Sequence, residues 1–172
     1  MTKHVKKSVR YPIRYLPNKL TKKDRGKQLL MLNKSRKMYK KGLYYKRDQV
    51  KSFKSKPSNH IKNALSLYKV DKIIPNKQLV QATGCSLGAL NKIVQKGEGA
   101  YYSSGSRPNQ SAQSWGLARL ASSLTSGKAA AVDFDILDKG CDHNKKAFIL
   151  AKKAKKKYGF GRSKTKGTKV IA

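Results

Sequence analysis

Apolar side chains recur three and four positions apart through the middle of the chain, which is the spacing of a helix that buries one face. After Ser58, a favourable N-cap, the apolar residues at 61, 64, 65 and 68 follow this spacing. Similar stretches, bounded by cap residues and glycines, predict four more helices: from Asn76 to Gly84, from Ser86 to Gly97, over residues 111–125, and from Asp142 to Tyr158.

A different period appears at residues 132–136, Val-Asp-Phe-Asp-Ile, where apolar and acidic residues alternate. Alternation with period two is typical of a half-buried strand, so this segment is the best strand candidate. Residues 99–110 are rich in Gly, Ser and Tyr, and this composition predicts a polar loop between two helices.

The N-terminal part has little apolar periodicity. Residues 1–20, with Pro12 and Pro17 among basic and aromatic residues, predict an extended arm. Thr21 followed by Asp24 predicts a capped helix start, and Gly42 predicts the end of that helix. The Gly-, Ser-, Thr- and Lys-rich tail, residues 159–172, is expected to be disordered by itself.

These elements predict a mostly α protein with a minor β component. We expect a small central helical domain, with a helix-turn-helix-like hairpin and a short strand, between extended basic arms. The predicted domains are a basic N-terminal arm with a docking helix over 1–56, a globular domain over 57–150, and a basic helix end and tail over 151–172. Apolar residues concentrate in the middle segment, so a core is expected there and not in the flanks.

The charge changes this picture, because 41 Lys and Arg face only 8 Asp and Glu, a net charge of +33. Residues 1–56 hold 20 cations against two acids, whereas residues 151–172 hold nine against none. Solubility needs a net charge of only about 2–8, and a larger excess opposes compaction, so a polyanionic partner is predicted. The candidate contacts are exposed-looking cations of the two flanks and one loop arginine: Lys22, Lys23, Arg25, Lys27, Lys40, Lys41, Lys46, Arg47, Arg107, Lys152, Lys153, Lys155, Lys156 and Lys157.

The hairpin over residues 79–94 has the helix, glycine turn, serine cap and second helix of a helix-turn-helix. In that arrangement the second helix reads base edges, and asparagine pairs with adenine. An ordinary αα-hairpin is the alternative, and Val80 and Gly88 depart from the DNA-reading pattern. The candidate reading residues are Gln81, Ser86, Asn91, Lys92 and Lys96.

The loop over residues 101–110 has hydroxyls, glycine amides and Arg107 just before a helix, which suits an anion site. The alternative is an ordered connection that packs its tyrosines on the core. The acids at 133, 135, 138 and 142, with His143, suit a divalent ion, but salt partners for the basic flanks are the favoured interpretation.

No nucleophile, base and orienting group can be assembled from the three scattered histidines, so we predict no enzyme, no cofactor, no metal and no small-molecule substrate. Cys85 and Cys141 are expected to be reduced, partly buried thiols of an intracellular protein. No apolar run approaches the roughly 20 residues that span a bilayer, and no signal peptide is evident.

Several sequence segments are distinctive: residues 35–42 with Tyr44 and Tyr45, residues 51–60, residues 96–110 (Lys-Gly-Glu-Gly-Ala-Tyr-Tyr-Ser-Ser-Gly-Ser-Arg-Pro-Asn-Gln), residues 114–121, residues 127–133 and Gly140-Cys141. Together they resemble a basic domain family of unassigned function from large, phycodnavirus-like DNA viruses of algae. The similarity covers roughly residues 11–155. It implies a context, a virus with a membrane-lined icosahedral particle, and it carries over no functional residue.

Within that context two hypotheses compete. Basic arms of this composition are expected to order only against neighbours, which favours a minor capsid protein that cements other capsid subunits in the virion. Its partners would be other capsid proteins, with acidic membrane headgroups or viral DNA as further contacts. The alternative is a DNA-binding protein, either a genome-condensing factor or a helix-turn-helix regulator.

Overall fold

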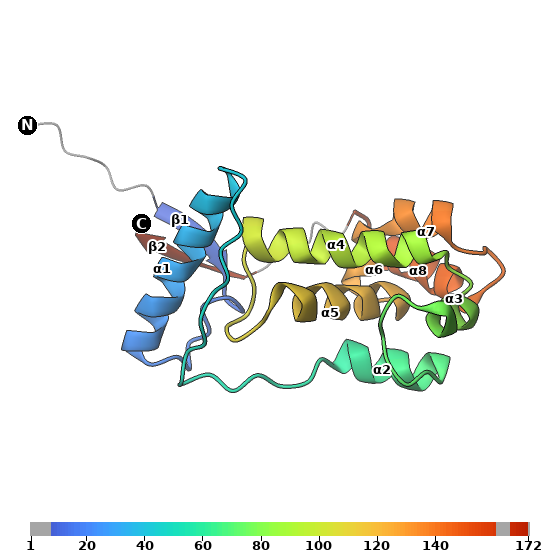
Figure 1. Cartoon of the computed structure of the whole chain (residues 1–172), viewed down its shortest axis with the longest axis horizontal. Coiled ribbons are helices and arrows are strands. Elements are labelled where there is room, and N and C mark those ends of the chain that lie inside the picture. Colours follow the sequence, from blue (N-terminus) through green and yellow to red (C-terminus); the bar gives the residue numbers. More distant parts are fainter. Residues whose placement is uncertain (1–7, 161–165, 172) are drawn as a thin grey trace, which may run out of the picture. The chain divides into compact units, whose positions relative to one another are not determined.

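The computed structural model describes residues 8–160 and 166–171, and over these residues the chain is mostly helical with one small sheet (Figure 1). The predicted fold class, mostly α with a minor β component, is confirmed. The elements are β1 (Ser8–Pro12), α1 (Lys22–Tyr39), α2 (Asn59–Tyr68), α3 (Lys77–Thr83), α4 (Leu87–Ser103), α5 (Ala112–Leu124), α6 (Lys128–Val132), α7 (Phe134–Gly140), α8 (Lys146–Tyr158) and β2 (Gly167–Ile171).

The chain divides into two compact units. The first unit comprises Met1–Ser55, Tyr102–Ser111 and Lys164–Ala172, and the second comprises Lys56–Tyr101 and Ala112–Ser163. The predicted boundary after residue 56 lies next to the division after Ser55. The structure differs in placing the 102–111 segment and β2 with the N-terminal flank, and α8 with the middle of the chain.

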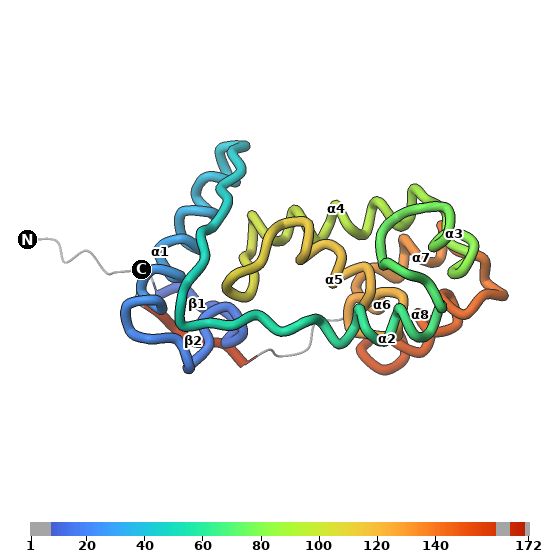
Figure 2. The backbone as a smooth tube through the Cα atoms, turned by 60° about the horizontal axis from the view of Figure 1, so that its bottom comes forward, coloured from blue at the N-terminus to red at the C-terminus, as the bar shows by residue number. Residues whose placement is uncertain are grey.

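The first unit joins the two ends of the sequence in an antiparallel sheet. β1 and β2 lie side by side (Figure 2). Their register runs from Ser8 opposite Ile171 to Pro12 opposite Gly167. The prediction that residues 159–172 are disordered is therefore wrong for 167–171, whose backbone finds its ladder partner at the other end of the chain. Residues 161–165 of that tail, and residues 1–7 of the predicted arm, lie outside the described residues.

The first unit also has an apolar core, which the sequence pattern did not predict. Tyr11, Leu16 and Leu32 are fully buried, and Leu20, Met31 and Val50 form a cluster with Tyr45 and Phe53. The helix contributes through one narrow stripe, since Gln28, Met31, Leu32 and Ser35 are its buried residues. The expectation of no core in the flanks is therefore wrong. The apolar residues of the turns before and after α1 pack on this stripe, although they show no regular spacing in the sequence.

Local signals placed the ends of α1 correctly. The Thr21 side chain accepts a hydrogen bond from the Asp24 amide, so Thr21 is the N-cap that the sequence predicted. After the helix, the Leu43 amide donates to the Met38 carbonyl and the Gly42 amide to the Tyr39 carbonyl. This is the Schellman pattern, and Gly42 takes the left-handed conformation that it requires, with φ of +75°.

The second unit packs α2 to α8 around a core that includes Leu79, Leu90, Ile93, Leu120 and Leu137. The helices predicted from Ser58, Asn76 and Ser86 and over 111–125 are present, and the Asn76 and Ser86 side chains accept the expected cap bonds. The last predicted helix begins later than expected, at Lys146. The Asp142 side chain instead accepts a bond from the Asn144 amide within the preceding turn.

Two predictions in this unit are wrong. α4 does not end at Gly97 but continues to Ser103, so half of the predicted 99–110 loop is helical. Gly97 is interior because α4 meets α5 there: a Cβ on Gly97 would lie 2.6 Å from the Gly116 Cα. The predicted strand over 132–136 is helical, since it spans the junction of α6 and α7 at Asp133.

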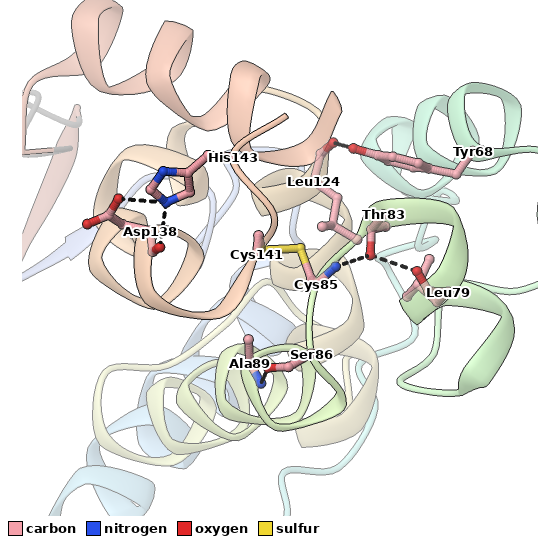
Figure 3. The surroundings of a disulfide bond; sticks show 10 residues. All are labelled: Tyr68, Leu79, Thr83, Cys85, Ser86, Ala89, Leu124, Asp138, Cys141 and His143. Atoms are coloured by element: carbon pink, nitrogen blue, oxygen red, sulfur yellow. Dashed lines mark hydrogen bonds and ion pairs between the residues drawn. A yellow bond between two sulfur atoms is a disulfide. The ribbon is translucent and has the colours of Figure 1, made fainter. Parts of the chain in front are cut away.

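The two cysteines form a disulfide, which overturns the expectation of reduced thiols (Figure 3). Cys85 follows the glycine turn after α3, and Cys141 follows α7, so the bond closes a sequence separation of 56 residues. The two turns pair as an isolated antiparallel bridge, in which the Ser86 amide donates to the Gly140 carbonyl and the Asp142 amide to the Gly84 carbonyl. These backbone bonds bring the two Cα atoms to 3.9 Å.

A search for membrane spans among the described residues finds no helix with the length and apolar character to cross a bilayer.

Candidate nucleic-acid interface

The fold concentrates positive charge in the first unit. Its described residues, 8–55, 102–111 and 166–171, carry 19 Lys and Arg against two acids, Asp24 and Asp48, a net charge of +17. The described residues of the second unit, 56–101 and 112–160, are more numerous but carry 17 cations against six acids, a net charge of +11. The first unit is therefore the more strongly basic of the two.

Helix α1 carries seven of these 19 cations. Only a narrow stripe of the helix is buried, so the remaining faces are open to a partner. Its 18 residues span about 27 Å at 1.5 Å per residue. Exposed lysines follow the helix and its C-terminal turn from one end to the other: Lys22, Lys23, Lys27, Lys34, Lys37, Lys40 and Lys41.

A basin lies at the N-terminal end of α1. It has a volume of about 520 Å³ and is lined by Thr21, Lys23, Asp24, Lys27, Gln49, Lys51 and Ser52. Much of its polar lining is engaged, because the Ser52 amide donates to Asp24 Oδ2 at 2.7 Å and Lys27 Nζ donates to the Gln49 carbonyl at 3.1 Å. The hydrogen bonds from Ser52 hold the pKa of Asp24 below its usual value, and Lys27 and Lys23 add to this effect.

Not every predicted cation of this unit faces solvent. Arg47 is buried, and its guanidinium donates to Ser35 Oγ at 2.9 Å and to Ser106 Oγ at 2.8 Å. Its proposed role as a partner contact is therefore wrong, since the side chain joins α1 to the 102–111 segment. Arg25 is half-buried and donates to the Leu16 carbonyl. The remaining candidates of the unit are exposed: Lys22, Lys23, Lys27, Lys40, Lys41, Lys46 and Arg107.

The segment after α4, residues 104–111, mainly holds the backbone of residues 50–53 in place. Asn109, which sequence reasoning did not single out, accepts a hydrogen bond from the Val50 amide and donates to the Val50 and Phe53 carbonyls. These contacts correspond to the ordered connection, the alternative favoured for this loop. The available signal in the sequence was the residue type, since asparagine tolerates the left-handed conformation. Asn109 adopts that conformation, with φ of +61°.

The five lysines predicted on the C-terminal helix lie on α8, in the second unit. Lys152, Lys153, Lys156 and Lys157 are exposed, whereas Lys155 is half-buried with its Nζ 5.0 Å from the ring centroid of Phe134. They therefore form a basic face of their own unit.

The helix-turn-helix-like hairpin is formed by α3 and α4, with Gly84 in the left-handed turn between them. Two of its candidate reading residues have structural roles: Ser86 Oγ accepts from the Ala89 amide, and Lys96 lies 2.9 Å from buried Asp133. Gln81, Asn91 and Lys92 are exposed. Exposed Asn91 and Lys92 near the start of α4 are as compatible with an ordinary αα-hairpin as with a helix that contacts bases.

Two acids of the second unit, Asp133 and Asp138, form ion pairs with residues of that same unit. Asp133 is fully buried, and Arg119 donates to both of its oxygens at 2.8 Å. Burial alone would raise the pKa of Asp133, but Arg119 and Lys96 outweigh it and hold that pKa below its usual value. Asp138 pairs with His143. Within residues 8–160 and 166–171, no three His, Cys, Asp or Glu side chains are grouped to hold a metal ion.

In a comparison with protein families, residues 12–146 match a model described as "Family of unknown function (DUF5824)". No curated protein and no solved structure matches the chain.

Proposed function

Because the chain belongs to the family of unknown function DUF5824, whose description assigns no activity, we propose from its charge and surface that the protein binds nucleic acid without sequence preference. The contacting part in this proposal is the first unit, and the contacted groups are backbone phosphates. A viral origin of the chain and its presence in a viral particle stay predictions.

The observation that carries the proposal is the gathering of basic segments, distant in the sequence, around one small core. A net charge of +17 on 64 described residues opposes compaction of the unit unless an anionic partner is present. A duplex offers one phosphate charge per about 1.7 Å of its axis, or about 16 along the 27 Å of α1. The exposed lysines that follow α1 along its length suit such a dense and repetitive partner.

The competing hypothesis of a minor capsid protein relied on basic arms that order only against neighbours. In the structure, residues 8–55 pack on their own core, with Tyr11, Leu16 and Leu32 fully buried. This removes the physical reason for preferring capsid neighbours over nucleic acid. The helix-turn-helix alternative is not preferred either, because it needs base contacts from α4, where the candidate residues include a cap and an ion-pair partner.

The test is the salt dependence of binding to a labelled 20-base-pair duplex of mixed sequence. A protein that contacts six to ten phosphates loses roughly 10³- to 10⁵-fold in affinity between 50 and 200 mM salt, with a slope of about −0.9 per contact. Replacing Lys22, Lys23 and Lys37 by alanine removes three exposed charges of α1. We expect the slope to fall in magnitude by about 2.7, because the variant makes three fewer phosphate contacts and binding therefore releases fewer counterions.

The matched control removes three exposed lysines from α8, by replacing Lys152, Lys153 and Lys156 with alanine. This variant has the same net charge as the α1 variant, and its slope is expected to change by less than about 1. Equal effects of the two variants would contradict the assignment to the first unit. Absence of binding at 50 mM salt, or binding insensitive to salt, would overturn the proposed function.

A further inference from the structure

Three exposed large apolar side chains of the first unit gather at the end of α1 and in the turn after it. We call residues 37–46 the α1 tip. Tyr44 is 70% exposed, Leu43 is 51% exposed and Tyr39 is 37% exposed. The Schellman turn at Gly42 reverses the chain, so that the residues that follow run back along α1, where Lys34 Nζ lies 4.5 Å from the ring centroid of Tyr45. Solubility alone does not explain why a tyrosine and a leucine are exposed next to each other in this turn.

The Tyr44 ring is held in place although most of it is exposed. Its centroid lies 6.2 Å from that of Tyr39 and 5.1 Å from that of Tyr102, both in edge-to-face geometry. Tyr102 is itself fixed against α1, because Ser35 Oγ donates to its carbonyl at 2.9 Å and Arg36 donates to the Ser104 carbonyl. A ring fixed in this way loses little conformational entropy when a flat partner stacks on it.

Positive charge surrounds this ring. Lys37, Lys40, Lys41 and Lys46 are exposed within the same ten residues, which contain no acid. Single-stranded nucleic acid matches both features, since it presents phosphates and unpaired bases together, and proteins bind it through basic grooves with stacking aromatic side chains. Duplex DNA offers the phosphates but keeps its base faces inside the stack.

We propose that the α1 tip stacks Tyr44 on an unpaired base, so that single-stranded nucleic acid is the preferred partner of the first unit. This inference rests on the proposed function, because the phosphate contacts of α1 supply the rest of the affinity. An acidic membrane surface is the less favoured partner. Interfacial binding needs an extended apolar face, whereas the tip offers one aliphatic side chain, Leu43, and α1 has no exposed apolar stripe.

The experiment compares a labelled 20-nucleotide single strand of mixed sequence with the same strand in a duplex, at one salt concentration. Tyr44→Ala is expected to weaken binding of the single strand by about 5- to 150-fold, the range measured for loss of one base–aromatic stack. Binding of the duplex should change less than about twofold, and the salt slope should stay the same because no charge is removed.

Three further variants separate stacking from other effects. Tyr44→Phe keeps the ring and is expected to bind within about twofold of the wild type, whereas Tyr44→Leu keeps apolar bulk but should lose the stack. Leu30→Ala removes an apolar side chain of similar exposure, 72%, from α1 and should have no effect. Circular dichroism of each variant checks that the fold is retained.

The outcomes distinguish the two proposals. If Tyr44→Ala weakens the single strand and the duplex equally, or neither, the stacking inference is overturned while salt-dependent binding still supports the proposed function. If the wild type binds no nucleic acid at 50 mM salt, the proposed function itself fails. If vesicles with 30% phosphatidylserine bind in a Tyr44-dependent manner and the single strand does not, the tip contacts lipid and the inference is wrong.

Discussion

The disulfide between Cys85 and Cys141 predicts a large effect on the stability of the second unit. Both side chains are almost fully buried, with exposed fractions of 1% and 8%. The bond closes a sequence separation of 56 residues. In the chain-entropy model, a cross-link over a loop of that length removes about 14 cal/mol/K from the unfolded chain, or about 4 kcal/mol at 25 °C.

The perturbation is made in two ways. Reduction of the wild type breaks the bond and keeps both sulfur atoms in place, whereas the double variant Cys85→Ala with Cys141→Ala removes both. Each is expected to lower the free energy of unfolding by about 4 kcal/mol, and the variant by up to 2 kcal/mol more because small cavities remain. The backbone bridge at Ser86 and Asp142 should persist, so the fold itself is retained.

The assay is urea unfolding followed by fluorescence of Trp115, the one tryptophan of the chain, which lies in α5 of the second unit. Oxidised wild type, reduced wild type and the double variant are compared, and the m-value should rise when the cross-link is absent because the unfolded state expands. Thiol titration and mass measurement give the oxidation state. Two free thiols in the natively folded, unreduced protein, or equal stability of all three forms, would refute the reasoning.

Two further predictions concern the same unit, and both use urea unfolding followed by tryptophan fluorescence. Gly97→Ala places a Cβ about 2.6 Å from the Gly116 backbone and should lower the free energy of unfolding by roughly 1–3 kcal/mol. Gly88 is exposed on the same helix with open space around it, so Gly88→Ala should raise the free energy of unfolding by about 0.5–1 kcal/mol. A Gly97→Ala variant more stable than Gly88→Ala would contradict the contact between α4 and α5. Asp133→Asn should destabilise by about 3 kcal/mol at pH 7, and exposed Asp135→Asn should change little. The pKa of Asp133 is lowered by folding, so its contribution is complete above its unfolded pKa of about 3.9 and is lost progressively as the pH falls from that value through the lower folded-state pKa. A stability gap to the variant that did not narrow on acidification below about pH 3.9 would argue against the ion pair.

The starts of α1 and α3 were predictable because each one depends on neighbours in the sequence. Thr21 and Asn76 accept hydrogen bonds from amides three residues later, at Asp24 and Leu79. Such a bond needs no distant partner, so a local sequence pattern places the helix start. The same holds for Gly84, whose left-handed conformation ends α3.

The wrong elements were those decided by distant residues. Gly97 has the residue type of a helix end, but it serves as the surface on which Gly116 of α5 packs. Residues 132–136 alternate in the sequence, yet Ala130, Ala131, Phe134 and Leu137 lie on the core at helical spacing, and Asp133 is fixed by Arg119. No local pattern contains these partners, and tertiary packing overrides a period of two over only five residues.

The candidate site followed the same rule. Exposed lysines of α1 were identified because charge is a property of each residue, whereas the burial of Arg47 depends on hydroxyls 12 and 59 residues away, at Ser35 and Ser106. The α1 tip brings Tyr44 against Tyr102, a separation that no spacing rule covers. The sequence shows basic and aromatic residues together, and only the fold shows which ring is both fixed and exposed.

The charge of the first unit connects its stability to its proposed ligand. Nineteen cations around a small core repel one another in the folded state, and a bound polyanion removes that repulsion. A ligand that binds the folded state stabilises it in proportion to its concentration over its dissociation constant. Within the folded unit Ser35 donates to the Tyr102 carbonyl, and the Tyr102 ring contacts that of Tyr44. A ligand that stabilises the folded unit is therefore expected to stabilise these contacts as well. Electrostatic binding and base stacking are therefore expected to reinforce each other, although only the first depends on salt.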